Sequence, residues 1–335
     1  MKPKVFITRE LPGKAIELIS EYYEVEVWRE YYPPPKDVII RKIKDLDALA
    51  SLLTDRIDSE VLGNASKLRI IAQYAVGYDN IDIEECTKRG IYVTNTPGVL
   101  TEAVADLTWA LLLAVARRIV EADNFVRSGA WERTRTGWHP LMMLGVDVHG
   151  KTLGIIGLGR IGSAVARRAK CFNMRILYYD IERKIELERE LGVQYVDLDS
   201  LLKNSDFISI HVPLTKATYH LIGERELKLM KPSAYLINTS RGAVIDEKAL
   251  IKALENKWIA GAALDVFEIE PTPKNNPLLK FPNIVVAPHI GSASRETREK
   301  MALMVAENLI KFAKGEIPPN LVNKNVVKIR SPGFT

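Results

Sequence analysis

A glycine-rich turn near the middle of the chain constrains the fold most strongly. Its glycines, Gly157, Gly159 and Gly162, have the spacing GxGxxG. The apolar run TLGII leads into the turn, and a helical pattern of apolar residues follows it. Between a strand and a helix, this spacing permits a tight turn, close packing of the helix and close approach of a pyrophosphate. The sequence therefore predicts a βαβ unit that binds a dinucleotide.

An acidic residue after the next strand extends this pattern. Asp180 closes the run RILYYD, eighteen residues after Gly162. A carboxylate at this place accepts hydrogen bonds from an adenosine ribose and repels a 2′-phosphate, which favours NAD over NADP. Arg183 and Lys184 follow and could pair with a 2′-phosphate, so NADP remains possible. The alternative role for Asp180 is that of a helix N-cap.

Strand and helix patterns alternate on both sides of the turn. Short β-branched runs separated by helical patterns are typical of parallel, doubly wound sheets, and continuous apolar strands indicate burial on both faces. A long helical pattern from Thr101, TEAVADLTWALLLAVARR, is apolar on most sides and should be buried against a domain or another subunit. Before it, strands are expected at 4–8, 25–28, 47–53, 68–75 and 91–95, and helices at 12–22 and 79–89. After it come a second βα series at 151–283 and a helix at 295–314.

Length and composition indicate how many domains the chain forms and which partners it is expected to lack. The 335 residues suggest two domains. The 47 Lys and Arg against 42 Asp and Glu give a net charge of +5 without any block of like charges, so neither nucleic acid nor membrane is expected as a partner. No apolar run is long enough to span a membrane, and the start MKPKVFITRE does not read as a signal peptide, so we expect a cytoplasmic location. The 2 Cys form no metal-binding or disulfide pattern, and no metal is expected.

Polar residues follow three of the later strands. Arg241 comes after AYLINTS, Asp265 closes GAALDV with Glu270 five residues beyond, and His289 closes NIVVAPH. Carboxyl ends of parallel strands meet at one edge of a sheet, where ligands bind. An Arg binds a carboxylate through two parallel hydrogen bonds, and a His beside a carboxylate is suited to deliver a proton. These residues predict reduction of a keto group next to a carboxylate. The remaining histidines fit less well: His139, His149, His211 and His220.

Seven stretches spread over nearly the whole chain carry a family resemblance. They read AVGYDNID, GIYVTNTPGVLTEAVAD, GLGRIG, HVPLTKAT, MKPSAYLINTSRGAVID, AGAALDVFEIEP and APHIGSAS. In these stretches the chain resembles the D-isomer-specific 2-hydroxyacid dehydrogenases, most closely the archaeal glyoxylate reductases of the glyoxylate/hydroxypyruvate reductase branch. The resemblance implies NAD(P)H-dependent reduction of a small 2-keto acid, glyoxylate to glycolate and also hydroxypyruvate to D-glycerate.

The resemblance also implies roles for individual residues. Arg241 binds the substrate carboxylate, and Glu270 pairs with His289, the proton donor in reduction. The implied cofactor contacts are Gly157, Leu158, Gly159, Arg160, Ile161, Gly162, Asp180, Thr239, Ser240, Arg241 and Asp265. The implied substrate contacts are Leu53, Tyr74, the backbone of Val76 and Gly77, Trp138 and Arg241.

The domain organisation implied by the resemblance is discontinuous. Residues 1–98 and 288–335 form a flavodoxin-like substrate domain, and residues 99–287 form an inserted Rossmann dinucleotide-binding domain, with the active site between them. A homodimer is implied, with a dimerisation helix near 101–118. Trp138 is then expected to reach the active site of the neighbouring subunit, or else to be an ordinary anchoring aromatic.

Several alternatives remain open. A dinucleotide-sensing binding protein has the same fold, as related transcriptional corepressors do, but the Arg, Glu and His set favours an enzyme. A phosphoglycerate dehydrogenase is a rival, although many carry a regulatory domain for which the tail after Lys314 leaves no room. Several archaeal relatives carry Ser followed by Arg at the position of Asp180, a pair suited to NADP. The sequence does not determine the preferred keto acid.

Overall fold

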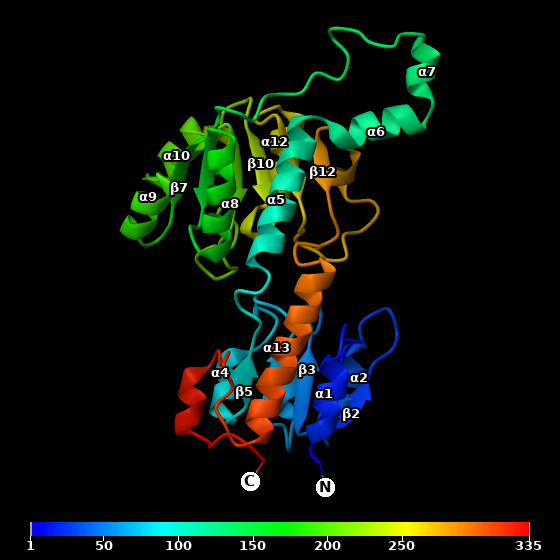
Figure 1. Cartoon of the computed structure of the whole chain (residues 1–335), viewed down its shortest axis with the longest axis vertical. Coiled ribbons are helices and arrows are strands. Elements are labelled where there is room, and N and C mark those ends of the chain that lie inside the picture. Colours follow the sequence, from blue (N-terminus) through cyan, green and yellow to red (C-terminus); the bar gives the residue numbers. More distant parts are fainter. Residues whose placement is uncertain (1, 335) are drawn as a thin grey trace. The chain divides into compact units, whose positions relative to one another are not determined.

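The computed structural model describes residues 2–334 and divides into two compact units (Figure 1). Unit 1 contains the residues up to Leu100 and those from Ser292 onward, and unit 2 spans Thr101–Gly291. The expected boundaries, after residues 98 and 287, lie two and four residues from these. Consequently His289 belongs to unit 2, together with Arg241 and Glu270.

Unit 1 is built on a five-stranded parallel sheet with the order β2-β1-β3-β4-β5. This is the flavodoxin-like order, in which ligands bind at the carboxyl ends of the strands near β1 and β3. Strands β3, β4 and β5 are buried along their whole length, as their continuous apolar sequences predict. The strands are β1 (Lys4–Ile7), β2 (Glu24–Val27), β3 (Ala48–Ser51), β4 (Ile70–Gln73) and β5 (Tyr92–Thr94).

Helices α3, α4 and α13 of unit 1 begin where short polar side chains bond to free backbone N–H groups. Asp58 and Asp82 cap two helices in this way, and Ser294 caps the long helix with which the chain re-enters the unit. That last helix packs against α1 and β4. The helices are α1 (Ala15–Tyr22), α2 (Lys36–Ile43), α3 (Ser59–Gly63), α4 (Ile83–Lys88), α13 (Arg295–Ala313) and the 3₁₀ turn η3 (Lys324–Lys328).

Unit 2 is built on a seven-stranded parallel sheet with the order β12-β11-β10-β9-β6-β7-β8. Counted from β6, this is the Rossmann order with one added strand, and the order reverses between β6 and β9. The strands are β6 (Thr152–Ile156), β7 (Arg175–Tyr179), β8 (Gln194–Tyr195), β9 (Phe207–Ile210), β10 (Tyr235–Asn238), β11 (Gly261–Leu264) and β12 (Ile284–Val286).

Helices α5 and α8 pack against each other in unit 2, and α5 also contacts β10, β11 and β12 (Figure 1). No helix in the described part of the chain is long and apolar enough to cross a membrane. The helices are α5 (Thr101–Ala116), α6 (Ile119–Arg127), α7 (Ala130–Thr134), α8 (Arg160–Cys171), α9 (Ile185–Leu191), α10 (Leu198–Asn204), α11 (Glu224–Leu229) and α12 (Glu247–Glu255), with 3₁₀ turns η1 (Gly242–Val244) and η2 (Pro277–Lys280).

The helix expected over 101–118 is shorter than its sequence pattern. It ends at Ala116, and Arg118 adopts a left-handed backbone conformation with φ 54° before α6 begins. Half of its residues are buried in the core of unit 2, so its apolar character is explained within one chain. Beyond it, α6 and α7 extend away from the sheet of unit 2 (Figure 1).

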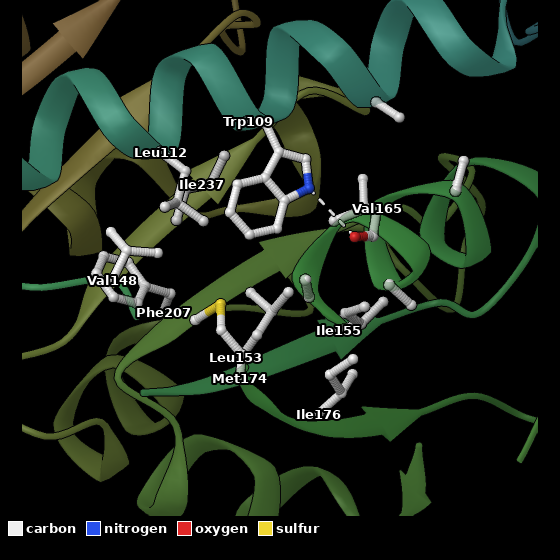
Figure 2. Close-up of a cluster of buried hydrophobic side chains, with 14 of the residues drawn as sticks. Trp109, Leu112, Val148, Leu153, Ile155, Val165, Met174, Ile176, Phe207 and Ile237 are labelled. Atoms are coloured by element: carbon white, nitrogen blue, oxygen red, sulfur yellow. Dashed lines mark hydrogen bonds between the residues drawn. The ribbon is translucent and has the colours of Figure 1, made fainter. Parts of the chain in front are cut away.

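Trp109 lies at the centre of the contact between α5 and α8 (Figure 2). Its ring stacks on Phe172, with centroids 4.6 Å apart and an interplanar angle of 8°. Its Nε1–H donates to the main-chain oxygen of Val165 at 3.2 Å. The indole nitrogen, the one polar atom of this large buried side chain, therefore has the hydrogen-bond partner that its burial requires.

We predict that Trp109→Ala lowers the free energy of unfolding by about 3–5 kcal/mol, because the lost ring leaves a cavity between α5 and α8. Trp109→Phe serves as the matched variant and should cost less, since an aromatic ring still fills the site. Urea denaturation followed by circular dichroism measures both. Equal stability of Trp109→Ala and the wild type would contradict this account of the core.

Candidate active site

The glycine turn of unit 2 has the geometry that its sequence predicts. Gly157 has φ 93°, and a Cβ there would lie 2.8 Å from the main-chain oxygen of His211. A Cβ on Gly162 would lie 2.1 Å from the main-chain oxygen of Gly157. Packing alone therefore requires these two glycines. A Cβ on Gly159 would meet no atom within 4 Å, so this glycine leaves open space in which a phosphate can approach the backbone.

The N-terminus of α8 is suited to bind an anion. Gly159 is its N-cap residue, so no side chain accepts from the first N–H groups, and no acidic residue stands in the first turn. Elsewhere Asp197 and Asp246 occupy the corresponding N-cap positions of α10 and α12. An uncapped helix N-terminus attracts phosphate through its free N–H groups and its dipole. The turn and the start of α8 thus fit the pyrophosphate of a dinucleotide.

Asp180 is tied to the glycine turn. Its Oδ2 accepts a hydrogen bond from the Leu158 N–H at 2.8 Å. The residue at the N-cap position of α9 is Lys184, so Asp180 does not play the alternative role of a helix cap. Because a carboxylate has about four acceptor sites, Asp180 can bond to a ribose while it holds the turn.

The segment after β10 folds around one buried amide. Asn238 Oδ1 accepts from the N–H and the hydroxyl of Ser240, and its Nδ2 donates to the main-chain oxygen of Arg241. The Thr239 hydroxyl lies 2.9 Å from that of Thr108 on α5. A Cβ on Gly242 would lie 1.9 Å from the backbone of the 267–268 segment, so this turn packs directly onto the segment that leads to Glu270.

Asp265 holds the backbone that follows β12. Its two carboxylate oxygens accept from the N–H groups of Ile290 and Gly291, each at 2.8 Å, and its main-chain oxygen accepts from His289 N at 2.8 Å. Burial raises the pKa of Asp265, although the Ile290 amide and the charge of His289 oppose that effect. The structure thus places Asp265 as a support for the His289 turn.

His289 and Glu270 form the central polar pair of unit 2. Nδ1 of His289 lies 2.7 Å from Oε2 of Glu270, while Oε1 of Glu270 accepts from Phe267 N at 2.9 Å. Burial acts to raise the pKa of Glu270, but the hydrogen bond from His289 and the positive charges of His289 and Arg241 outweigh it and lower the pKa. Glu270 is therefore an ionised carboxylate that fixes the ring, and Nε2 of His289 is left for other partners. Arg241, Glu270 and His289 all lie in unit 2, and the charge of Arg241 acts on Glu270. Their joint catalytic role stays a prediction.

In unit 1 the expected substrate residues lie in two turns after β3 and β4. Leu53 is exposed, and Tyr74 is buried with its hydroxyl bonded to the Arg298 main-chain oxygen at 2.8 Å; burial raises its pKa to about 12. Within the described residues, the N–H groups of Val76 and Gly77 donate to no protein acceptor. These two adjacent amides are suited to bind an anion.

A polar network that the sequence analysis missed holds these two turns. Gln73 donates to Asn80 Oδ1 at 2.8 Å and to the Gly77 main-chain oxygen at 3.4 Å. Asn80 in turn donates to the main-chain oxygens of Leu52 and Asp55. The buried carboxylate of Asp55 accepts from Leu52 N at 2.7 Å. A buried glutamine at the end of an otherwise apolar strand was the available sequence signal.

His211, and a group of possible metal ligands that includes His220, already have protein contacts. Burial lowers the pKa of His211 to about 3, so its ring is neutral beside the Ser209 hydroxyl. His220, Asp246 and Glu268 are close enough to hold a metal ion. His220 already bonds to Glu268 at 2.6 Å, and Asp246 caps α12, so protein contacts account for this group.

Comparison with known proteins identifies the family. A family model described as D-isomer specific 2-hydroxyacid dehydrogenase, NAD binding domain, matches residues 109–291, more than half of the chain. The chain is 66% identical to a glyoxylate reductase of Thermococcus litoralis over 332 residues, which is 99% of this chain and 100% of that protein. It is 64% identical to a glyoxylate reductase of Korarchaeum cryptofilum over 334 residues, 100% of both chains.

Solved structures agree with this match. A crystal structure of a Thermus thermophilus protein superposes with a TM-score of 0.89 at 47% identity, covering 95% of this chain and 99% of that one. An NADPH-dependent glyoxylate/hydroxypyruvate reductase of Sinorhizobium meliloti, in complex with NADP and malonate, gives a TM-score of 0.85 at 34% identity, covering 97% and 98%. The chain therefore belongs to the D-isomer specific 2-hydroxyacid dehydrogenases. The predicted family, fold class and NAD-binding domain are confirmed.

We predict opposite outcomes for two glycine substitutions in the turn. Gly162→Ala should lower the melting temperature or prevent folding, because its methyl group would strike the main-chain oxygen of Gly157. Gly159→Ala should fold like the wild type and bind NADH roughly tenfold more weakly, a loss of about 1.4 kcal/mol, since the methyl group occupies the approach of the pyrophosphate. Thermal melting and NADH titration measure the two effects. Wild-type NADH affinity in Gly159→Ala would refute this use of the turn.

Proposed function

We propose that this protein reduces a small 2-keto acid with NADH, with glyoxylate as the main substrate and hydroxypyruvate as a second one. The observation that carries the proposal is the His289–Glu270 pair, with Arg241 on the same sheet edge as the glycine turn. The similar proteins of Thermococcus litoralis and Korarchaeum cryptofilum are both named glyoxylate reductases. Asp180 favours NADH, while NADPH remains a possible coenzyme.

In this proposal Arg241 selects and orients the substrate. Its guanidinium group forms two parallel hydrogen bonds with the substrate carboxylate, which also places the neighbouring keto group. The N–H groups of Val76 and Gly77 bind the same carboxylate, and Leu53 and Tyr74 line the substrate pocket. Because these groups bind a carboxylate, every substrate must carry one next to the reacting carbon.

His289 supplies the proton. Glu270 fixes the ring through Nδ1 and stabilises its positive charge, so that Nε2 donates to the keto oxygen in reduction and accepts the proton in oxidation. The nicotinamide coenzyme, when bound, supplies the hydride. The glycine turn with Leu158, Arg160 and Ile161 holds its pyrophosphate, Asp180 its ribose, and Thr239, Ser240 and Asp265 the nicotinamide end.

We predict that purified protein oxidises NADH when glyoxylate is added, and that two variants separate the roles. His289→Ala should lower kcat by roughly 10²–10⁴ and leave NADH binding nearly unchanged, because only proton transfer is lost. Arg241→Lys should raise KM for glyoxylate and lower kcat, because an ammonium group cannot form the paired hydrogen bonds. Absorbance of NADH and a binding titration give these values. No oxidation with any short 2-keto acid would overturn the proposed reaction, and normal turnover in both variants would overturn the residue roles.

The proposed enzyme is a homodimer in the cytoplasm, in which α6, α7 and the following segment contact the partner. This part of unit 2 exposes a set of apolar side chains of the kind that mark interfaces. They are Ile119, Val120, Val126, Trp131, Trp138, Leu141 and Leu144. Trp138, with 75% of its surface exposed, would reach the neighbouring subunit's substrate pocket.

We predict that the wild type sediments as a dimer and that Val126→Glu combined with Leu141→Glu shifts it to a monomer, because two charges would be buried at the interface. Trp138→Ala should remain dimeric but raise KM for glyoxylate. Analytical ultracentrifugation and steady-state kinetics test both statements. A monomeric wild type at micromolar concentration would exclude this arrangement.

A further inference from the structure

The segment between β7 and α9 carries two cations beside the expected ribose site. Arg183 and Lys184 follow Asp180 at the place where a positive side chain would meet the 2′-phosphate of NADPH. Each is already paired with a carboxylate. Arg183 donates from Nε and Nη2 to the two oxygens of Glu188, each at 2.8 Å, and Lys184 Nζ lies 2.5 Å from Glu182.

Glu188 is the better fixed of the two carboxylates. Its side chain is 16% exposed, whereas that of Glu182 is 76% exposed. The Tyr178 hydroxyl donates to Glu188 Oε1 at 2.7 Å and accepts from Lys184 N at 2.8 Å. Since Tyr178 is a buried residue of β7, it anchors Glu188 to the sheet. The hydrogen bonds from Arg183 and Tyr178 lower the pKa of Glu188 to about 2.

Arg183 is consequently held from two sides. Glu188 takes the two parallel hydrogen bonds that the Nε–Nη2 edge of the guanidinium group offers to a carboxylate or a phosphate. The guanidinium carbon also lies 5.9 Å from the centre of the Tyr195 ring, within reach of a cation–π interaction. A 2′-phosphate would have to displace Glu188 before it could use the same donors. Lys184 and the exposed Glu182 form a surface pair, which contributes little.

We propose that Glu188 is a specificity-determining residue for the coenzyme. It keeps Arg183 in an ion pair and so withholds the cation that would otherwise bind the 2′-phosphate of NADPH. The inference rests on the proposed use of NADH and adds a second cause of that preference. Asp180 repels the 2′-phosphate. Glu188 holds Arg183, whose positive charge would otherwise compensate for that repulsion.

The variant Glu188→Gln tests this directly. Glutamine keeps the size of the side chain and an oxygen for the Tyr178 hydroxyl, but it loses the charge that retains Arg183. We expect NADPH to bind roughly tenfold more tightly than to the wild type, the gain from one charge-assisted contact. NADH affinity should change by less than about twofold, because NADH has no 2′-phosphate. Isothermal titration calorimetry gives both dissociation constants without turnover.

Two further variants complete the test. Adding Arg183→Gln to Glu188→Gln should abolish the gain for NADPH, because the released cation is gone. Arg183→Leu alone should leave NADPH affinity as in the wild type, because Arg183 is already paired with Glu188 there. Since Arg183 is exposed, this variant should fold, so the test does not depend on whether Glu188→Gln folds.

Three results would overturn the inference. These are an unchanged ratio of NADPH to NADH affinity in Glu188→Gln, a gain that persists in the double variant, and a clear loss of NADPH affinity in Arg183→Leu. Because coenzyme binding is measured without substrate, a protein that binds NADH but reduces no 2-keto acid would contradict the proposed function and not this inference.

Discussion

The site in unit 2 depends on one buried aspartate, Asp265, that binds the backbone of three consecutive residues. Asp265 accepts from Ile290 N and Gly291 N through its side chain and from His289 N through its main-chain oxygen. His289 has φ 55°, a left-handed conformation that is unusual for a residue other than glycine. These hydrogen bonds fix that conformation. With the backbone fixed, the ring meets Glu270, and Nε2 remains for a substrate.

Parallel strands explain why the remaining groups gather at the same edge. In unit 2 the glycine turn follows β6, Arg241 follows β10, Asp265 follows β11 and His289 follows β12. The order of strands reverses between β6 and β9, which opens space for a ligand at the carboxyl ends. Unit 1 uses the same principle, with Gln73 and Asn80 holding the two turns that carry its candidate substrate residues. The binding groups are thus loop residues that strands and buried hydrogen bonds keep in position.

The sequence predicted the elements that follow from local pattern. Apolar strands and the glycine spacing predicted both sheets and the dinucleotide turn. Polar residues at strand ends predicted Arg241, Glu270 and His289 as the catalytic set, which stays a prediction. Contacts between distant segments were not predictable in this way. Asn80 donates to the main-chain oxygen of Leu52, 28 residues earlier, and Asp265 supports a turn that begins 24 residues later. The end of α5 was also missed, because the left-handed conformation of Arg118 has no signal in the apolar pattern.

In the proposed reaction, His289 gives the proton to the keto oxygen of a substrate whose carboxylate is bound by Arg241. A crystal structure with NADH and oxamate, an unreactive analogue of a 2-keto acid, measures this most directly. We predict that Nε2 of His289 lies about 2.6–3.2 Å from the amide oxygen of oxamate, which replaces the keto oxygen, and that the carboxylate of oxamate is bound by Arg241. Oxamate bound in the opposite orientation, or a His289 ring turned away from it, would contradict the account.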